Sequence, residues 1–203
     1  MQRGQNLQLA YDLAFYDKGA SFTGIRNKMD ARWRPGKNDF YSRFETVNGE
    51  QSISESASNN QYLRWQQGYN RRFELNDGKS RIEAGGNWLR ERSAINGLNL
   101  TDSLLGNSFW YDQYEINTRF ADSSGWDAAI DMNSRQDYLP QNGDFSPSTL
   151  ARTLSIQTAK RGNGGGNFRI NATYRSLEIT DSSEKEETIQ GRLDWDSWWF
   201  KRL

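Results

Sequence analysis

Apolar and polar side chains alternate with a period of two along most of the chain. Leu7, Leu9 and Tyr11, for example, alternate with Gln8 and Ala10. Successive side chains of a β-strand point to opposite faces of a sheet, so this pattern predicts strands with one apolar and one polar face. The same alternation recurs in about ten segments, near 7–15, 25–33, 40–47, 63–75, 82–88, 113–120, 126–135, 153–158, 168–175 and 189–196.

These segments are longer than the strands of most soluble proteins. They run for roughly 10 to 14 residues, whereas an average strand in a globular protein has about 5 or 6. A tilted strand needs about 9 to 11 residues to cross the hydrocarbon core of a bilayer. The length of the segments therefore favours a membrane-spanning sheet over an ordinary sandwich.

The connections between the segments are alternately short and long. The short ones are 35–38, 77–78, 123–125 and 162–166, and the long ones are 48–60, 94–108, 139–149 and 180–187. The first connection, 17–21, is short where a long one is expected. Membrane barrels have tight turns at one edge and long loops at the other. The chain is therefore predicted to be all-β, with residues 1–203 forming one antiparallel up-and-down meander of about ten long strands, a transmembrane β-barrel or part of one.

Two turns predict the register of their hairpins. Asp77-Gly78 suits a two-residue type I′ turn, because Gly adopts positive φ freely and Asp tolerates it. This turn pairs Glu74 with Arg81, Arg72 with Glu83, Arg64 with Glu91, Phe73 with Ile82, Tyr69 with Gly86 and Trp65 with Arg90. A four-residue loop at 35–38 pairs Arg34 with Asp39, Asp30 with Arg43, Lys28 with Glu45 and Trp33 with Phe40. In both hairpins, opposite charges then share one face, which supports the assignment.

The two faces of the predicted sheet need two environments. The polar face carries charges of both signs and is predicted to line the interior of the barrel. Its candidate lumen-facing residues are Arg26, Lys28, Arg32, Arg64, Arg72, Glu83, Arg119, Asp131, Arg169, Arg175 and Arg192. The apolar face is predicted to meet lipid, with a membrane-interface belt of aromatic residues near the short turns. This belt comprises Trp33, Phe40, Phe73, Phe120, Trp126 and Phe168, and a looser second belt near the long loops comprises Trp65, Trp88, Trp110 and Tyr138.

Four polar residues fall on the apolar face and count against lipid contact. They are Arg71, Asn27, Gln67 and Arg152. Arg71 lies close enough to a strand end to extend its charge to the interface, whereas Asn27 and Gln67 have no such explanation from sequence. An Arg that faces lipid costs about 2 to 4 kcal/mol at the midplane and little near the interfaces. The mean hydropathy of −0.96 is also polar for a barrel.

Composition excludes several kinds of chemistry. The 26 Lys and Arg balance the 26 Asp and Glu, so no basic excess indicates a nucleic-acid partner. The chain contains no His and no Cys, which removes disulfides, thiol chemistry and the commonest metal ligands. The remaining carboxylates lie among arginines, an arrangement that keeps ions paired. We therefore expect no catalytic residues, no metal, no cofactor and no enzymatic activity.

In strand length, alternation and loop asymmetry, most of the chain resembles the Gram-negative outer-membrane β-barrel class, in the form of a segment of a porin-like or large translocon-type barrel. The resemblance implies localisation in the outer membrane, short turns in the periplasm and long loops outside. Such barrels tend to end on an aromatic residue, whereas this chain ends on Leu203. It also opens without the apolar segment of a signal peptide. We therefore expect a piece of a longer chain whose further strands continue the barrel.

Two functional hypotheses follow. The first is a structural or transport role, in which the chain forms a membrane-spanning wall with a polar, charge-paired lumen and has the lipid bilayer as its partner. The mixed charges predict little net ion selectivity. The second is a soluble all-β module that binds carbohydrate or another ligand through exposed Trp and Tyr, with Trp65 and Trp110 as candidates.

Overall fold

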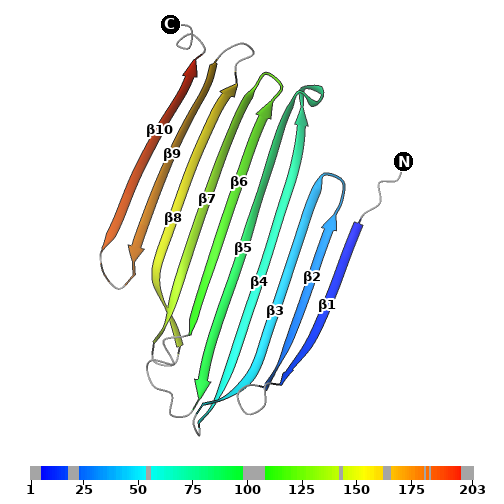
Figure 1. Ribbon diagram of the computed structural model, residues 1–203, viewed down its shortest axis with the longest axis vertical. Helices are drawn as coiled ribbons and strands as arrows, with labels where there is room; N and C mark the ends of the chain where they lie inside the picture. Colours follow the sequence, from blue (N-terminus) through cyan, green and yellow to red (C-terminus); the bar gives the residue numbers. More distant parts are fainter. Residues whose placement is uncertain are drawn as a thin grey trace.

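The computed structural model describes residues 6–17, 23–53, 56–97, 108–141, 144–161, 166–180, 182 and 184–197. They form one antiparallel sheet of ten strands in sequence order (Figure 1). The strands are β1 (Asn6–Asp17), β2 (Thr23–Arg34), β3 (Asn38–Ile53), β4 (Ser56–Leu75), β5 (Ser80–Gly97), β6 (Phe109–Asp122), β7 (Trp126–Gln141), β8 (Asp144–Arg161), β9 (Gly166–Ile179) and β10 (Lys185–Ser197). One short 3-10 turn, η2 (Asn76–Gly78), joins β4 to β5. The predicted all-β, up-and-down meander is confirmed.

The hairpin of β4 and β5 has the predicted register. Leu75 faces Ser80, and all six residue pairs expected from the Asp77-Gly78 turn are present. Asp77 and Gly78 have φ values of 55° and 86°, and the Lys79 N–H donates to the Asn76 carbonyl over 3.1 Å. A type I′ turn requires positive φ at both central positions, which explains why this dipeptide determines the pairing.

The hairpin of β2 and β3 also follows the sequence. Trp33 faces Phe40, and the Asp30–Arg43 and Lys28–Glu45 pairs lie in the same register. Pro35 lies in the turn, where its missing N–H removes no ladder hydrogen bond.

Two connections predicted to be long are mostly strand. β3 continues to residue 53 and β4 begins at residue 56, so the loop expected at 48–60 is wrong. The loop expected at 139–149 is wrong in the same way, because β7 ends at 141 and β8 begins at 144. The stretch 48–60 is mostly polar, and the stretch 139–149 is interrupted by Pro140 and Pro147, so neither shows the regular alternation that identifies a strand, although their backbones still pair. Residues 18–22, 98–107 and 162–165, in three other predicted connections, lie outside the described residues.

The strands are staggered relative to the edge that carries the short turns. One hydrogen-bonded row crosses all ten strands through Leu7, Trp33, Phe40, Tyr69, Gly86, Ile116, Met132, Leu154, Tyr174 and Ile189. Leu7 lies one residue from the short-turn end of β1, whereas Ile189 lies eight residues from that end of β10. With about 3.3 Å per residue and 4.8 Å between strands, this drift corresponds to a tilt of about 30°. Closed barrels require such a stagger, with strands tilted by about 35–45°.

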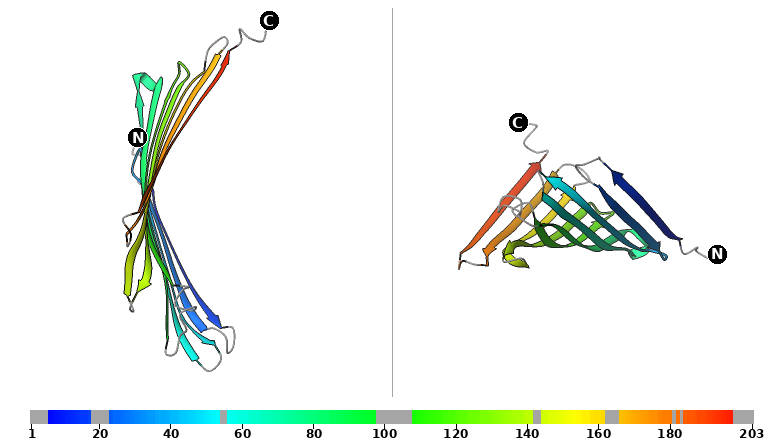
Figure 2. Two further views of the ribbon diagram at one scale, coloured as in Figure 1. Left: turned by 90° about the vertical axis from the view of Figure 1, so that its left-hand side faces the viewer. Right: turned by 90° about the horizontal axis from the view of Figure 1, so that it is seen from below.

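The sheet is twisted and open, and no second layer of described residues covers either face (Figure 2). β1 and β10 are its two edges and do not pair with each other. Ala94 is the only buried hydrophobic residue in the described part of the chain. The solvent-accessible area is 14714 Å², whereas a compact protein of this mass exposes roughly 9,800 Å². The chain therefore presents two open faces rather than a core.

Candidate functional site

All eleven candidate lumen residues lie on the same face of the sheet. The register places Arg72, Glu83, Arg119 and Arg192 in one hydrogen-bonded row, with Ala129, Gln157 and Asn171 between them. The other seven, Arg26, Lys28, Arg32, Arg64, Asp131, Arg169 and Arg175, occupy alternate positions of this face on their own strands. This surface is called the polar face below, and the opposite surface is called the apolar face.

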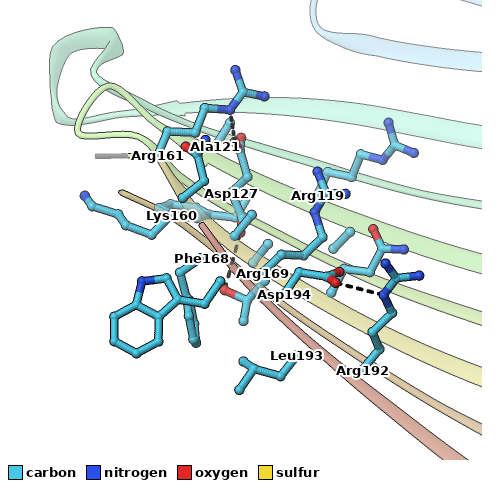
Figure 3. Close-up of a pocket in the computed structure, with 18 of the residues that line it drawn as sticks. Arg119, Ala121, Asp127, Lys160, Arg161, Phe168, Arg169, Arg192, Leu193 and Asp194 are labelled. Atoms are coloured by element: carbon cyan, nitrogen blue, oxygen red, sulfur yellow. Dashed lines mark hydrogen bonds and ion pairs between the residues drawn. The ribbon is translucent and has the colours of Figure 1, made fainter. Parts of the chain in front are cut away.

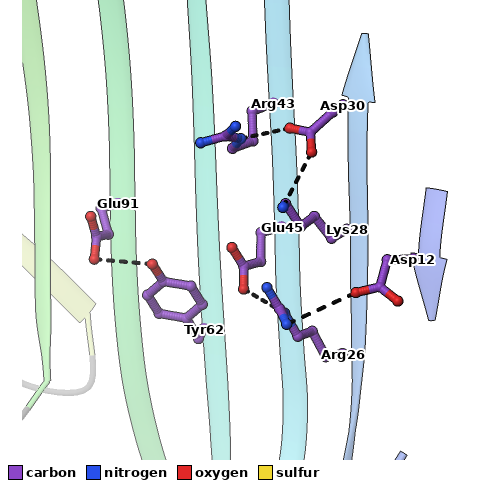
Figure 4. A network of polar contacts seen from close by, with 8 residues as sticks. All are labelled: Asp12, Arg26, Lys28, Asp30, Arg43, Glu45, Tyr62 and Glu91. Carbon is purple, nitrogen blue, oxygen red and sulfur yellow. Dashed lines mark hydrogen bonds and ion pairs between the residues drawn. The ribbon is translucent and has the colours of Figure 1, made fainter. Parts of the chain in front are cut away.

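Ion pairs bind β1, β2 and β3 together on the polar face (Figure 4). The Nε of Arg26 donates to Glu45 over 2.7 Å, and the guanidinium also lies 4.0 Å from Asp12. Asp30 lies between Lys28 at 3.2 Å and Arg43 at 2.6 Å. Charges in this part of the face are therefore compensated by neighbours on the adjoining strands.

In the centre of the polar face, most of the hydrogen bonds involve tyrosine hydroxyls and side-chain amides. Glu91 accepts hydrogen bonds from the hydroxyls of Tyr62 at 3.1 Å and Tyr111 at 2.7 Å. The Tyr41 hydroxyl donates to Asn87 over 2.9 Å, and the ring of Tyr41 lies over Gly68, where no side chain obstructs it. These contacts give the face a hydrogen-bonded surface that contains few apolar groups.

The opposite charges in the β4–β5 hairpin face each other, but they pair differently from the prediction. Arg72 lies 3.6 Å from Glu74 on its own strand, and Arg81 lies 3.4 Å from Glu83. Glu74 also accepts from Lys37 over 3.1 Å. Residues two apart on a strand share a face, so these contacts compete with the directly opposite pairs.

The six aromatic residues of the predicted first belt all lie on the apolar face near the short turns. Trp33 stacks on Phe40 with 5.4 Å between ring centroids, and Phe40 lies 4.6 Å from Tyr69. The remaining four, Phe73, Phe120, Trp126 and Phe168, lie within two residues of the short-turn ends of their strands. The six residues therefore lie on one face along the edge that carries the short turns.

The apolar face changes character at a fixed distance from the short turns. On six strands, the residue ten positions from the short-turn end is polar, charged or tryptophan. In the order β4, β5, β6, β7, β9 and β10, these residues are Trp65, Arg90, Asp112, Gln136, Ser176 and Glu187. Nearer the short turns, the same strands present mainly aliphatic and aromatic residues, including Ile82, Ile116, Met132, Ile170 and Leu193. The boundary between the apolar and polar parts of this face stays at a constant distance from the strand ends. It does not follow the hydrogen-bonded rows, which are tilted relative to those ends, so it has the geometry of a planar interface.

Arg90 and Asp112 form an ion pair with two hydrogen bonds at this boundary. The Nε and Nη2 of Arg90 donate to the two carboxylate oxygens of Asp112 over 2.7 and 2.9 Å. The guanidinium lies 5.5 Å from the ring centroid of Trp88 and 5.1 Å from that of Trp110. Trp110 also stacks on Tyr138 at 4.3 Å. The sequence showed Arg90 opposite Trp65 but missed Asp112, whose place on the apolar side of its strand was the available signal.

The band between the two belts has the height of a hydrocarbon layer. Phe73 and Trp65 are eight residues apart on β4, and Phe120 and Trp110 are ten apart on β6. At a tilt of about 30°, these separations correspond to about 23 to 29 Å along the membrane normal, and the apolar band of membrane barrels is about 25 Å tall.

Most of the polar residues that counted against lipid lie close to the ends of this band. The guanidinium of Arg71 lies 4.6 Å above the ring of Phe73 in the first belt. Arg152 is nine residues from the short-turn end of β8, beside the charged boundary. Asn27 accepts a hydrogen bond from the Tyr11 hydroxyl over 2.8 Å. Gln67 is eight residues from its strand end, one step inside Trp65.

A carboxylate at the short-turn edge stabilises the β6–β7 turn outside the apolar band. Hydrogen bonds from the side chain of Ser124 hold the pKa of Asp122 below its usual range, and the Ser124 backbone, Ser80 and Ser123 act in the same direction. The Ser124 hydroxyl donates to Asp122 over 2.6 Å.

No helix in the described ranges has the length and hydrophobicity needed to cross a membrane. Across the same residues, no group of three or more carboxylates is arranged to hold a metal ion.

No protein-family model matches the chain, and no curated protein matches it in sequence. Among solved structures, the chain is similar to the beta domain of the Bordetella autotransporter BrkA, with 12% sequence identity and a TM-score of 0.23. The similarity covers 93% of this chain and 78% of that chain. At this level the likeness assigns no family and carries no argument about function.

Proposed function

We propose that the chain is a membrane-spanning wall of a Gram-negative outer-membrane β-barrel, with a structural or transport role. In this proposal the apolar face meets the hydrocarbon of the bilayer, and the polar face lines the lumen. The short turns lie on the periplasmic side and the extended hairpins lie outside. The chain acts through binding and passage of solutes, without catalysis.

The change of the apolar face at the tenth residue carries this proposal. A soluble sheet has no reason to place mainly aliphatic and aromatic residues up to one line and polar or charged residues at that line on five of six strands, with a tryptophan on the sixth. A bilayer does, because charged groups are costly in hydrocarbon and are tolerated at the interface. Beyond this line, the hairpin of β3–β4 continues with a mostly polar sequence, as water on both sides would permit.

The exposure of the apolar side chains supports the same conclusion. Ile116 and Met132, in the middle of the sheet, are 56% and 48% exposed, and Leu193, near one edge, is 63% exposed. Contiguous exposed apolar residues on several neighbouring strands mark a contact surface rather than a surface that faces water. Contact of this face with hydrocarbon would remove these apolar side chains from water.

The two open edges indicate how the wall continues. β1 and β10 each present one side of a long strand without a partner in the described sheet. Long exposed edges promote aggregation, and closure into a barrel abolishes them. We propose that further strands of a longer chain pair with both edges.

Reconstitution tests the proposal. The purified chain should require detergent to stay in solution and should float with liposomes in a density gradient, with its strand content retained by circular dichroism. A folded monomer that stays in plain buffer and leaves the liposomes unbound would contradict the membrane proposal. It would favour the soluble ligand-binding hypothesis instead, which loss of glycan binding in Trp65→Ala or Trp110→Ala would then test.

A further inference from the structure

A hollow of about 1200 Å³ lies over β5 to β10 near their short-turn ends. Five arginines border it on the polar face: Arg81, Arg119, Arg161, Arg169 and Arg192. Glu83, Asp127 and Asp194 are the carboxylates on the same side of this lining. The hollow therefore departs from the even charge balance of the whole chain and carries a local positive excess.

Small side chains create the space. Ala121, Ala129 and Ala159 occupy polar-face positions of β6, β7 and β8, where neighbouring positions carry long charged residues. Ala129 faces Arg119 on β6, and Ala159 faces Arg169 on β9. Arg119 and Arg169 each lie beside an alanine whose methyl group is short, which leaves room for a bound molecule.

Two of the five arginines have no polar side-chain partner among the described residues. Arg192 donates to Asp194 over 2.9 Å, Arg161 lies 3.7 Å from Asp127, and Arg81 pairs with Glu83. No hydrogen bond or ion pair to another described residue engages the side chain of Arg119 or Arg169. In Figure 3 the dashed lines join Arg161 to Asp127 and Arg192 to Asp194, and a third marks the bond from the Thr158 hydroxyl to the Asp127 carbonyl; none ends on the side chain of Arg119 or Arg169. The carboxylates of the hollow are thus already compensated, and two guanidinium groups remain available.

We propose that this hollow is an oxyanion-binding site for a solute that carries a diphosphate group, held between Arg119 and Arg169. Guanidinium groups bind phosphate oxygens through paired N–H donors. β6 and β9 are three strand spacings apart, about 14 Å. This separation suits two long side chains that converge on a two-centred anion better than on a single phosphate. The inference rests on the proposed function only in that the polar face must border water.

Titration of the full chain in detergent micelles with pyrophosphate tests the site, with calorimetry as the readout at an ionic strength of about 0.1 M. We expect Arg119→Gln and Arg169→Gln each to weaken pyrophosphate binding about tenfold or more. Orthophosphate should bind the wild-type chain more weakly than pyrophosphate, because it can engage one guanidinium group at a time.

Arg43→Gln is the matched control, since it removes the same charge from the same face outside the hollow, where Arg43 pairs with Asp30. It should change pyrophosphate binding by less than about twofold. The proposal is overturned if the wild-type chain does not bind pyrophosphate, or if Arg43→Gln loses as much affinity as the other two variants. Circular dichroism of each variant confirms that the sheet is intact. Because the measurement is made in micelles, its failure leaves the liposome result untouched, and the two proposals fail independently.

Discussion

Arg90 on β5 and Asp112 on β6 face each other and form two N–H···O hydrogen bonds on the otherwise apolar face of the sheet. The Asp112 side chain is only 5% exposed, and its partner Arg90 lies against the rings of Trp88 and Trp110. A charge pair satisfied in this way is tolerable at the edge of a hydrocarbon layer, where an unpaired charge would be costly. The pair therefore marks the height at which the proposed lipid contact ends.

Removing the acidic partner should destabilise the sheet. Asp112→Asn keeps the shape of the side chain but leaves the Arg90 charge without its carboxylate, so we expect the free energy of unfolding in micelles to fall by about 1 to 3 kcal/mol. Urea titration followed by tryptophan fluorescence measures this change. Asp131→Asn is the control, because Asp131 lies on the polar face and contacts no described residue through a hydrogen bond or ion pair. An equal loss in both variants would argue against a special role for the pair.

A charge in the middle of the apolar face should oppose membrane insertion. Met132 lies six residues from the short-turn end of β7, near the midpoint of the band, and is 48% exposed. We expect Met132→Arg to make folding into liposomes less favourable by about 2 to 4 kcal/mol.

The neighbouring variant Asn133→Arg places the same charge on the polar face beside Glu115 and should cost less than about 0.5 kcal/mol. If the apolar face met water, Met132→Arg would change the folding free energy as little as Asn133→Arg, because the Met132 side chain is already half exposed. Similar values for the two variants would thus speak for water on both faces.

A methyl group at Gly68 should disturb the polar face. A Cβ at this position would lie 2.2 Å from the ring of Tyr41, so the ring must move and lose the hydrogen bond from its hydroxyl to Asn87. We expect Gly68→Ala to lower the free energy of unfolding by about 1 to 2 kcal/mol. Gly191→Ala, where no atom lies within 4 Å of the new Cβ, should leave stability nearly unchanged. Adding Tyr41→Ala should relieve most of the clash, and its failure to do so would place the cost in the backbone.

The fold could be predicted from the sequence wherever one face is apolar. Alternation placed each candidate lumen residue on one face and each belt residue on the other, because a strand has only two faces and the apolar set selects between them. The Asp77-Gly78 turn fixed the β4–β5 register through its need for positive φ.

The parts that failed are those where alternation is absent. The stretches 48–53 and 56–60 are mostly polar without regular alternation, so the sequence predicts a loop there although their backbones pair. Ion pairing could not be predicted either, because Arg72 can contact Glu74 on its own strand or Glu83 opposite, and sequence does not rank the two. The hollow depends on which alanines adjoin which arginines across strands, and only the full register shows this for Ala129 and Arg119.

Alternation of lipid exposure along one strand tests the central claim most directly. The chain has no cysteine, so single cysteines at positions 128 to 133 of β7 can each carry a spin label without a background signal. In liposomes, labels at 128, 130 and 132 should be accessible to oxygen and protected from a water-soluble nickel chelate, and labels at 129, 131 and 133 should show the reverse. Equal access of the nickel chelate to both sets would contradict lipid contact of the apolar face, and with it the membrane-wall proposal.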